Sequence, residues 1–217
     1  MIPLLYRQQV FEKSWIADAE IANRQKFYFA QFEGEDPAII AAVTPVYDHL
    51  TTLTSNEKEA DRFCVLAFDE QKAGNVYTVG FANAFSTFLT SLGIKEIFLI
   101  QDLCNNWETF GFDKEQDKAA FFELTGKDVS HQGLLLDQSL LSLILPLLYH
   151  NNPDQGDCSF YTLNNDLPIG MLYWKGNIHI SCFEKDMNQI IDAADKAKLV
   201  LGGREIAHAY YFGKKLD

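Results

Sequence analysis

The clearest structural signal in this chain is a β-hairpin in residues 169–183, which read Ile169-Gly170-Met171-Leu172-Tyr173-Trp174-Lys175-Gly176-Asn177-Ile178-His179-Ile180-Ser181-Cys182-Phe183. The two apolar halves are rich in β-branched and aromatic residues, which fit the pleated, half-buried surface of a sheet. Lys175 and Gly176 between them are typical of a tight turn. The stretch therefore predicts two neighbouring antiparallel strands, 169–174 and 177–183.

Regular elements are also predicted on both sides of this hairpin. Residues 159–163 read as a further strand, after a loop rich in Asn and Asp at 151–157. Residues 184–201 have the apolar spacing of an amphipathic helix, and Gly202-Gly203 would close it. The alternation of Ile206, His208, Tyr210 and Phe212 then predicts one more strand.

The first half of the chain suggests another hairpin and one isolated strand. Residues 62–69 and 76–81 are apolar, and Lys72-Ala73-Gly74-Asn75 would turn the chain between them. Asn83 would then cap a short helix that ends at Gly93. Residues 94–100 follow as a strand rich in β-branched and aromatic side chains.

Four further segments are predicted to be helical. They are residues 8–32, residues 37–50 opened by Asp36-Pro37, residues 113–124 closed by Gly126, and residues 137–149. Pro45 is expected to kink or split the second of these, and Phe27-Tyr28-Phe29 could instead begin a strand. The most apolar stretch, 134–148, is interrupted by Asp137 and is shorter than the roughly 20 residues that cross a bilayer. We interpret it as a buried helix and expect no insertion into a membrane.

Together these elements predict an α+β fold with a mixed or mainly antiparallel sheet and helices packed against it. No linker or internal repeat divides the 217 residues, so we expect a single domain over 1–217. The N-terminus lacks a secretory signal, and the four cysteines are widely spaced. A cytoplasmic protein with reduced thiols is the expected reading, and two disulfides are the alternative in an oxidising compartment.

The charge balance bears on the partners of the chain. Eighteen basic residues stand against thirty acidic ones, a net charge of -12, and no local run of basic residues breaks the pattern. Nucleic-acid binding is disfavoured, because phosphate neutralisation needs a basic face. An acidic surface can attract a basic protein or can simply maintain solubility.

The sequence contains no complete motif for a cofactor or for a known catalytic site. The phosphate loop, dinucleotide fingerprint, nucleophile elbow and zincin pair are all missing, and Ser55-Asn56-Glu57-Lys58 matches only a generic Ser-x-x-Lys spacing. The oxygen-rich segment around Asp154, Asp157 and Asp166 could coordinate Ca²⁺ or Mg²⁺. Its spacing fits no known loop, so we expect a solvated turn, no metal and no cofactor.

Two histidines in predicted strands are the only candidates for a catalytic site. The sheet could bring His179 and His208 together with a carboxylate such as Glu184 or Glu205, and imidazole is the usual general base near neutral pH. Nothing in the spacing requires this proximity. Two unrelated strand histidines are the simpler interpretation.

An aromatic segment after the strand at 94–100 is the candidate partner-binding surface. It contains Trp107, Glu108, Phe110 and Phe112 in a loop-like context where binding surfaces often form. Packing of these rings into the core is the alternative.

Two hypotheses of function follow. The first is a non-enzymatic acidic protein-binding module that neutralises a basic partner such as a bacterial toxin, as an immunity-type protein does. This is an analogy of charge and size alone. The second is an enzyme or small-molecule-binding protein with its site around His179 and His208.

Overall fold

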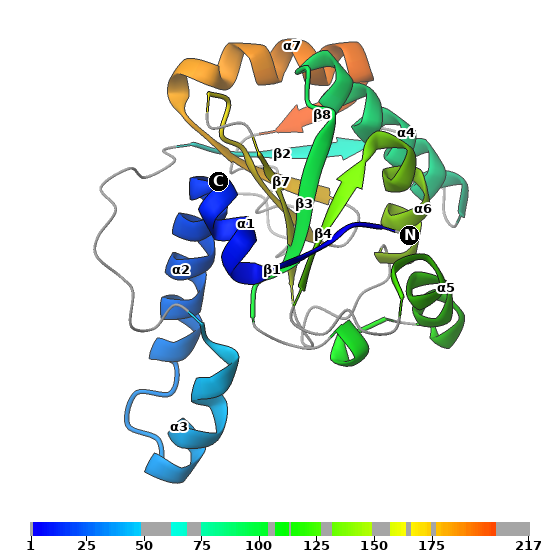
Figure 1. The fold of residues 1–217 in the computed structure, drawn as a ribbon. Coiled ribbons are helices and arrows are strands. Elements are labelled where there is room, and N and C mark those ends of the chain that lie inside the picture. Colours follow the sequence, from blue (N-terminus) through cyan, green and yellow to red (C-terminus); the bar gives the residue numbers. More distant parts are fainter. Residues whose placement is uncertain are drawn as a thin grey trace, which may run out of the picture.

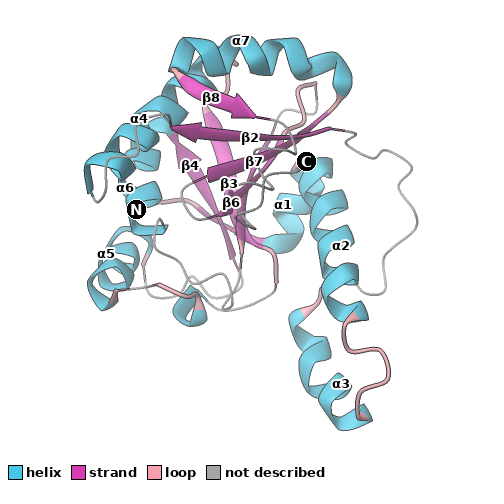
Figure 2. Ribbon diagram, turned by 180° about the vertical axis from the view of Figure 1, so that it is seen from behind, coloured by secondary structure: helices cyan, strands magenta, loops and turns pink. Residues whose placement is uncertain are grey.

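The computed structural model shows an α+β fold in which helices pack against both faces of an antiparallel sheet (Figures 1 and 2). It describes residues 2–48, 62–68, 75–103, 107–112, 114–126, 132–148, 157–163, 166–174 and 177–202. The predicted fold class is therefore confirmed.

Eight strands in the described part of the chain form one sheet in the order β1-β4-β3-β5-β6-β7-β2-β8, and each neighbouring pair is antiparallel. The strands are β1 (Leu4–Tyr6), β2 (Arg62–Phe68), β3 (Glu96–Gln101), β4 (Gln132–Asp137), β5 (Cys158–Thr162), β6 (Gly170–Trp174), β7 (Asn177–Cys182) and β8 (Leu199–Gly202). The hairpin predicted at 169–183 is present as β6 and β7, with Leu172 opposite His179. The strands predicted at 94–100 and 159–163 correspond to β3 and β5.

The helices are α1 (Arg7–Lys13), α2 (Trp15–Ala30), α3 (Pro37–Val43), α4 (Asn75–Ser91), α5 (Glu115–Thr125), α6 (Gln138–Leu148) and α7 (Met187–Ala197). Short 3-10 turns lie at Thr44–Val46, Trp107–Thr109 and Glu184–Asp186. No helix among the described residues has both the length and the apolar character needed to cross a lipid bilayer.

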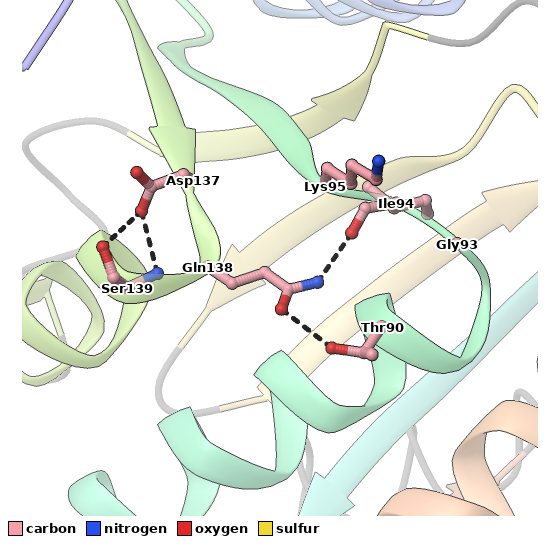
Figure 3. A pocket seen from close by; sticks show the side chains of 7 residues that line it. All are labelled: Thr90, Gly93, Ile94, Lys95, Asp137, Gln138 and Ser139. Atoms are coloured by element: carbon pink, nitrogen blue, oxygen red, sulfur yellow. Dashed lines mark hydrogen bonds between the residues drawn. The ribbon is translucent and has the colours of Figure 1, made fainter.

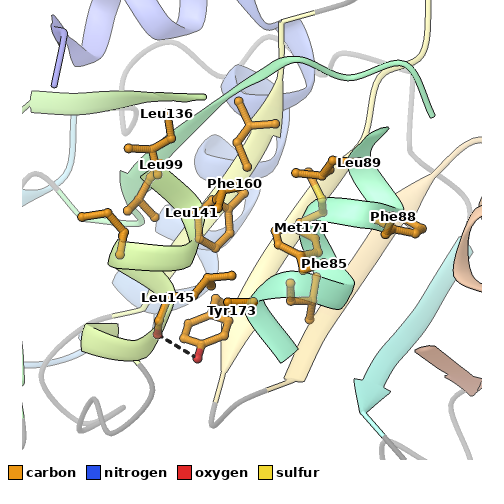
Figure 4. Packing of buried hydrophobic residues seen from close by; sticks show 14 of the residues in the cluster. Phe85, Phe88, Leu89, Leu99, Leu136, Leu141, Leu145, Phe160, Met171 and Tyr173 are labelled. Atoms are coloured by element: carbon orange, nitrogen blue, oxygen red, sulfur yellow. Dashed lines mark hydrogen bonds between the residues drawn. The ribbon is translucent and has the colours of Figure 1, made fainter. Parts of the chain in front are cut away.

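The larger hydrophobic core lies on the sheet face covered by α4, α6 and α7. Rings from α4, including Phe85 and Phe88, pack toward Phe160 of β5 and Tyr173 of β6 (Figure 4). The Tyr173 hydroxyl donates a hydrogen bond to the backbone oxygen of Leu145 in α6 at 3.5 Å. The phenol is thereby buried with its polar end partnered.

The second sheet face is covered by α1 and α2. Val10, Ile16 and Ile21 pack there against Phe98, Ile100 and Tyr161 of the sheet. Because side chains alternate along a strand, Phe160 and Tyr161 of β5 belong to opposite cores. The same alternation places Ser159, His179 and Ser181 on the α2 side, where charged side chains are also found.

The local end signals of two predicted helices are confirmed. Asp36 caps α3 by accepting a hydrogen bond from the Ala38 backbone nitrogen, and α5 ends at Gly126, whose φ of 90° favours glycine. The helix predicted at 8–32 is present in two pieces, because Ser14 between them is extended. The Ser14 hydroxyl donates instead to the Thr162 backbone oxygen at 2.7 Å.

The hairpin predicted from 62–69 and 76–81 is wrong in its second strand. Residues 76–81 belong to α4, and Asn83 lies inside that helix rather than at its cap. β2 pairs instead with β7 and β8, which lie far away in sequence. The helix is favoured because Phe81, Phe85 and Phe88 share one face and are buried together.

The helix predicted at 137–149 is present as α6, but two runs interpreted as helical, 134–148 and 184–201, each include part of a strand. The apolar run at 134–148 begins inside β4 and becomes helical only after Asp137, whose carboxylate accepts hydrogen bonds from the Ser139 and Leu140 backbone nitrogens. Likewise α7 ends at Ala197, Lys198 adopts a left-handed φ of 56°, and β8 follows. A short apolar run alone does not distinguish a strand from a buried helix.

Candidate functional site

A group of charged side chains is enclosed between α2 and the sheet. Arg24 donates from Nη1 to both carboxylate oxygens of Asp102 at 2.8 Å and to Ser159 Oγ at 2.6 Å, and from Nη2 to Glu20 Oε2 at 2.8 Å. Asp102 follows β3 and its side chain is 1% exposed, whereas that of Arg24 is 19% exposed. We call Glu20, Arg24, Asp102 and Ser159 the Arg24 network.

The electrostatics of this network keep Arg24 positively charged. Burial lowers the pKa of Arg24, but Asp102, Tyr161 and Glu20 together outweigh burial and raise this pKa well above its ordinary value. Burial raises the pKa of Glu20, although Arg24 and a hydrogen bond with Ser181 oppose this change. The result is one firm ion pair, Arg24 with Asp102, next to a carboxyl group that binds a proton more readily than usual.

Glycine at position 170 makes room for the Glu20 carboxyl group. A Cβ atom placed on Gly170 would lie 2.6 Å from Glu20 Cδ, which is far inside van der Waals contact. The position of the Glu20 carboxyl group in the network therefore depends on the absence of a side chain at Gly170 in β6.

A second polar contact lies beside the network, at the last point where α2 touches the sheet. The Tyr28 hydroxyl donates to Asp157 Oδ2 at 3.2 Å. Burial and the nearby Asp102 carboxylate raise the pKa of Asp157 to about 6, while Tyr28 and Arg24 act in the opposite direction. Asp157 therefore titrates closer to neutral pH than an ordinary aspartate.

His179, one of the two histidine candidates, lies in β7 on the same sheet face and is 3% exposed. Burial and the charge of Arg24 lower the pKa of His179 to about 4, so the imidazole is neutral at neutral pH. Glu184 is exposed in the turn that precedes α7. His208 and Glu205 lie outside the described residues, so the grouping of the two histidines stays a prediction.

The aromatic segment chosen as a partner surface lies mainly in the core. Trp107 and Phe110 are 1% and 3% exposed, and Trp107 packs on Phe121 of α5 with ring centroids 5.0 Å apart. Phe112 is half-buried against the same core, and Glu108 is exposed. Of these residues, Glu108 is accessible to a partner, whereas the rings of Trp107 and Phe110 are not. Packing into the core, the alternative interpretation, describes these two rings.

The described residues contain a surface pocket at the junction of α4, β3 and α6, with a volume of about 490 Å³ (Figure 3). Several of its polar groups bind one another: Gln138 donates to the Ile94 backbone oxygen and accepts from the Thr90 hydroxyl, each at 2.8 Å. Asp137 is occupied as the cap of α6. The contacts of Gln138 fasten α4 and α6 together.

The described residues contain no group of three His, Cys, Asp or Glu side chains placed to share a metal ion. Most of the oxygen-rich loop, including Asp154, lies outside the described residues, and Asp166 is exposed.

The end of α2 and the following segment form an arm, residues 26–47, that projects beyond the sheet and the other helices (Figures 1 and 2). Its inner side is held by aromatic contacts, with Phe29 and Tyr47 ring centroids 5.3 Å apart. At its end, Asp48 accepts from Arg7 Nε at 2.6 Å and from Gln25 Nε2 at 2.7 Å. The arm is therefore fastened to the body by α2 and by Asp48.

The outer surface of the arm is apolar. Helix α3, Pro37-Ala38-Ile39-Ile40-Ala41-Ala42-Val43, contains no charged residue and no buried residue. Ile39 is 44% exposed and Phe27 is 68% exposed. Glu33, Glu35 and Asp36 are exposed beside α3, so the apolar surface has an acidic border.

Sequence reasoning missed both the arm and the Arg24 network. The arm had a visible signal, because residues 37–43 of the predicted helix are all apolar and have no polar side chain to present to water. Glu20 and Arg24 have the i,i+4 spacing of a helical ion pair, but nothing local indicates that Asp102 lies beside them. Comparisons with protein-family models, curated proteins and solved structures find no match to this chain.

Proposed function

We propose that this chain is a non-enzymatic protein-binding module whose arm docks onto a basic protein. The observation that supports this most strongly is α3, a helix of seven apolar residues, none of them buried, held away from the body. Apolar surface rimmed by polar residues is typical of sites that bind other proteins. A short helix of this kind fits an apolar groove in a partner.

The charge around α3 indicates the kind of partner. Between residues 26 and 47 the exposed charges are Lys26 against Glu33, Glu35 and Asp36, and the whole chain carries -12. A second copy of this chain would bring two acidic borders together, which is unfavourable. A groove with a basic border matches both the apolar surface and its acidic rim.

Neutralisation of a basic toxin, as immunity-type proteins do, is the specific form of this function that we propose. An acidic arm bound tightly over the basic functional surface of a toxin would block the access of the toxin's target to that surface. Its charge would also speed the encounter with the toxin. The alternative, an enzyme around His179 and His208, gains no support from the described residues, because His179 is buried.

Photo-crosslinking tests the proposal directly. A benzophenone amino acid at Ile39 should crosslink one basic protein in host extract, and the same probe at Ile191 should not. Ile191 is a matched control because it is also a helical isoleucine, 39% exposed, and lies on α7 away from the arm.

The captured protein is then purified and its affinity measured by calorimetry. Ile39→Asp should weaken binding by about tenfold or more, the loss expected from an interfacial anchor, while Ile191→Asp leaves it unchanged. Raised salt should slow association. A crosslink only to a second copy of this chain, an acidic partner, or equal effects of the two variants would each overturn the proposal.

A further inference from the structure

The arm leaves the body at a hydrogen bond between a tyrosine hydroxyl and a carboxyl group that titrates near neutral pH. Tyr28 lies on α2 only two residues beyond the start of the arm, and its hydroxyl donates to Asp157. Asp157 immediately precedes β5, and its backbone oxygen accepts from the Asp102 backbone nitrogen at 3.0 Å. The contact therefore joins the root of the arm to the edge of the Arg24 network.

The charged and titratable groups around Asp157 come from both sides of this junction. Tyr28 and Arg24 face it from α2, Asp102 faces it from the end of β3, and Cys158 follows it in β5. Arg24 is already engaged by Asp102 and Glu20, so its charge is shared. Among the described residues, Asp157 Oδ1 accepts no hydrogen bond. The ionised carboxylate is thus held mainly by the Tyr28 hydroxyl.

We propose that the Tyr28–Asp157 hydrogen bond is a proton-operated tether that sets how firmly the arm is held against the sheet. A hydroxyl bound to a charged carboxylate makes a stronger hydrogen bond than one bound to a neutral carboxyl group. Deprotonated Asp157 therefore holds Tyr28 tightly. Protonation weakens that bond, so acid loosens the root of the arm, even though loss of the repulsion between Asp157 and Asp102 favours the fold as a whole.

The consequence for binding rests on the proposed function, whereas the tether itself does not. If α3 docks onto a basic partner, a firmly held arm loses less freedom on binding than a loose one. Docking would then be favoured near neutral pH and weakened in acid.

The tether can be tested by NMR on the isolated full chain. Methyl labels on Ala38, Ala41 and Ala42 report on the arm, and Ala193, buried in α7, is the control. The side-chain carbon of Asp157 reports its own titration. In the wild type, the arm methyl signals should shift and sharpen with a midpoint near pH 6, the value at which Asp157 titrates.

Two variants separate the tether from other titrations. Asp157→Asn should abolish the arm transition near pH 6 and keep the arm in its acid form throughout. Tyr28→Phe should raise the midpoint of Asp157 by up to about one pH unit and leave the arm methyls without a response to it.

An arm that does not follow the titration of Asp157, or that follows it equally well in Tyr28→Phe, overturns the tether. Neither result would affect crosslinking at Ile39 and so would leave the docking proposal intact. Conversely, a working tether with no basic partner captured at Ile39 would overturn only the docking proposal.

Discussion

Replacing Asp102 by Asn should destabilise the fold by about 3 kcal/mol, because it leaves the Arg24 guanidinium enclosed without its main counter-charge. Asp102 is 1% exposed and accepts two hydrogen bonds from Arg24 and one from Ser159. Removal of one partner from a buried pair typically costs 3–5 kcal/mol, and we take about the lower end because Arg24 retains 19% exposure and the Glu20 contact.

Urea unfolding followed by circular dichroism measures this effect. With a denaturant slope of about 2–3 kcal/mol/M, a loss of 3 kcal/mol lowers the midpoint by about 1–1.5 M. Asp166→Asn, at an exposed aspartate, should stay within about 0.5 kcal/mol of the wild type.

A double variant tests the physical reason for the loss. Arg24→Met combined with Asp102→Asn removes both charges, so it should be more stable than Asp102→Asn alone. A loss below about 1 kcal/mol for Asp102→Asn, or a double variant whose loss equals the sum of the single losses, would refute the view that the pair is a coupled buried ion pair.

Three further predictions concern local features of the fold. The folded-state pKa of His179 lies below its unfolded value, so the stability that His179 contributes is present above about pH 6.5 and is lost as pH falls toward 4. The variant His179→Asn should therefore flatten this part of a plot of unfolding free energy against pH. Gly170→Ala should cost about 1–3 kcal/mol by displacing the Glu20 carboxyl group, and Glu20→Ala in the same chain should recover part of this loss in thermal unfolding. Asp137→Ala should cost about 1 kcal/mol by removing the cap of α6, as measured by urea unfolding, and an unchanged midpoint would contradict the capping role.

The opposing pH dependence of Asp157 makes the His179 measurement informative. The folded-state pKa of Asp157 is raised to about 6, so the stability it contributes is present below about pH 4 and is lost as pH rises through 6. The two groups therefore oppose each other between pH 4 and 6. Comparison of His179→Asn with Asp157→Asn separates them.

Much of the secondary structure was predictable, and the errors share a cause. The β6–β7 hairpin, β3 and β5 were recognised from β-rich runs bounded by turns. The second strand predicted at 76–81 was wrong because Val76, Thr78 and Val79 favour a strand locally, whereas burial of the α4 rings against the sheet favours a helix. In the same way, β4 and β8 were hidden inside runs that suit either a strand or a buried helix.

The candidate site was less predictable than the fold. His179 was correctly placed in a strand, but its charged neighbour Arg24 comes from α2, which only the folded structure brings close to β7. Trp107 and Phe110 look like surface aromatics in a loop, and only the position of α5 reveals that they are enclosed. Burial depends on which elements pack together, and this packing cannot be read from the local sequence.

The sequence by itself determined the α+β class, the acidic charge, the central hairpin and the ends of several helices. These features depend on contacts within a few residues, such as the Asp36 carboxylate with the Ala38 nitrogen or the positive φ at Gly126. The tertiary structure alone decided the pairing of β2 with β7 and β8, the meeting of Arg24 with Asp102 across 78 positions, and the exposure of α3. These features depend on the total apolar surface that distant segments bury together, and no local sequence pattern predicts that total.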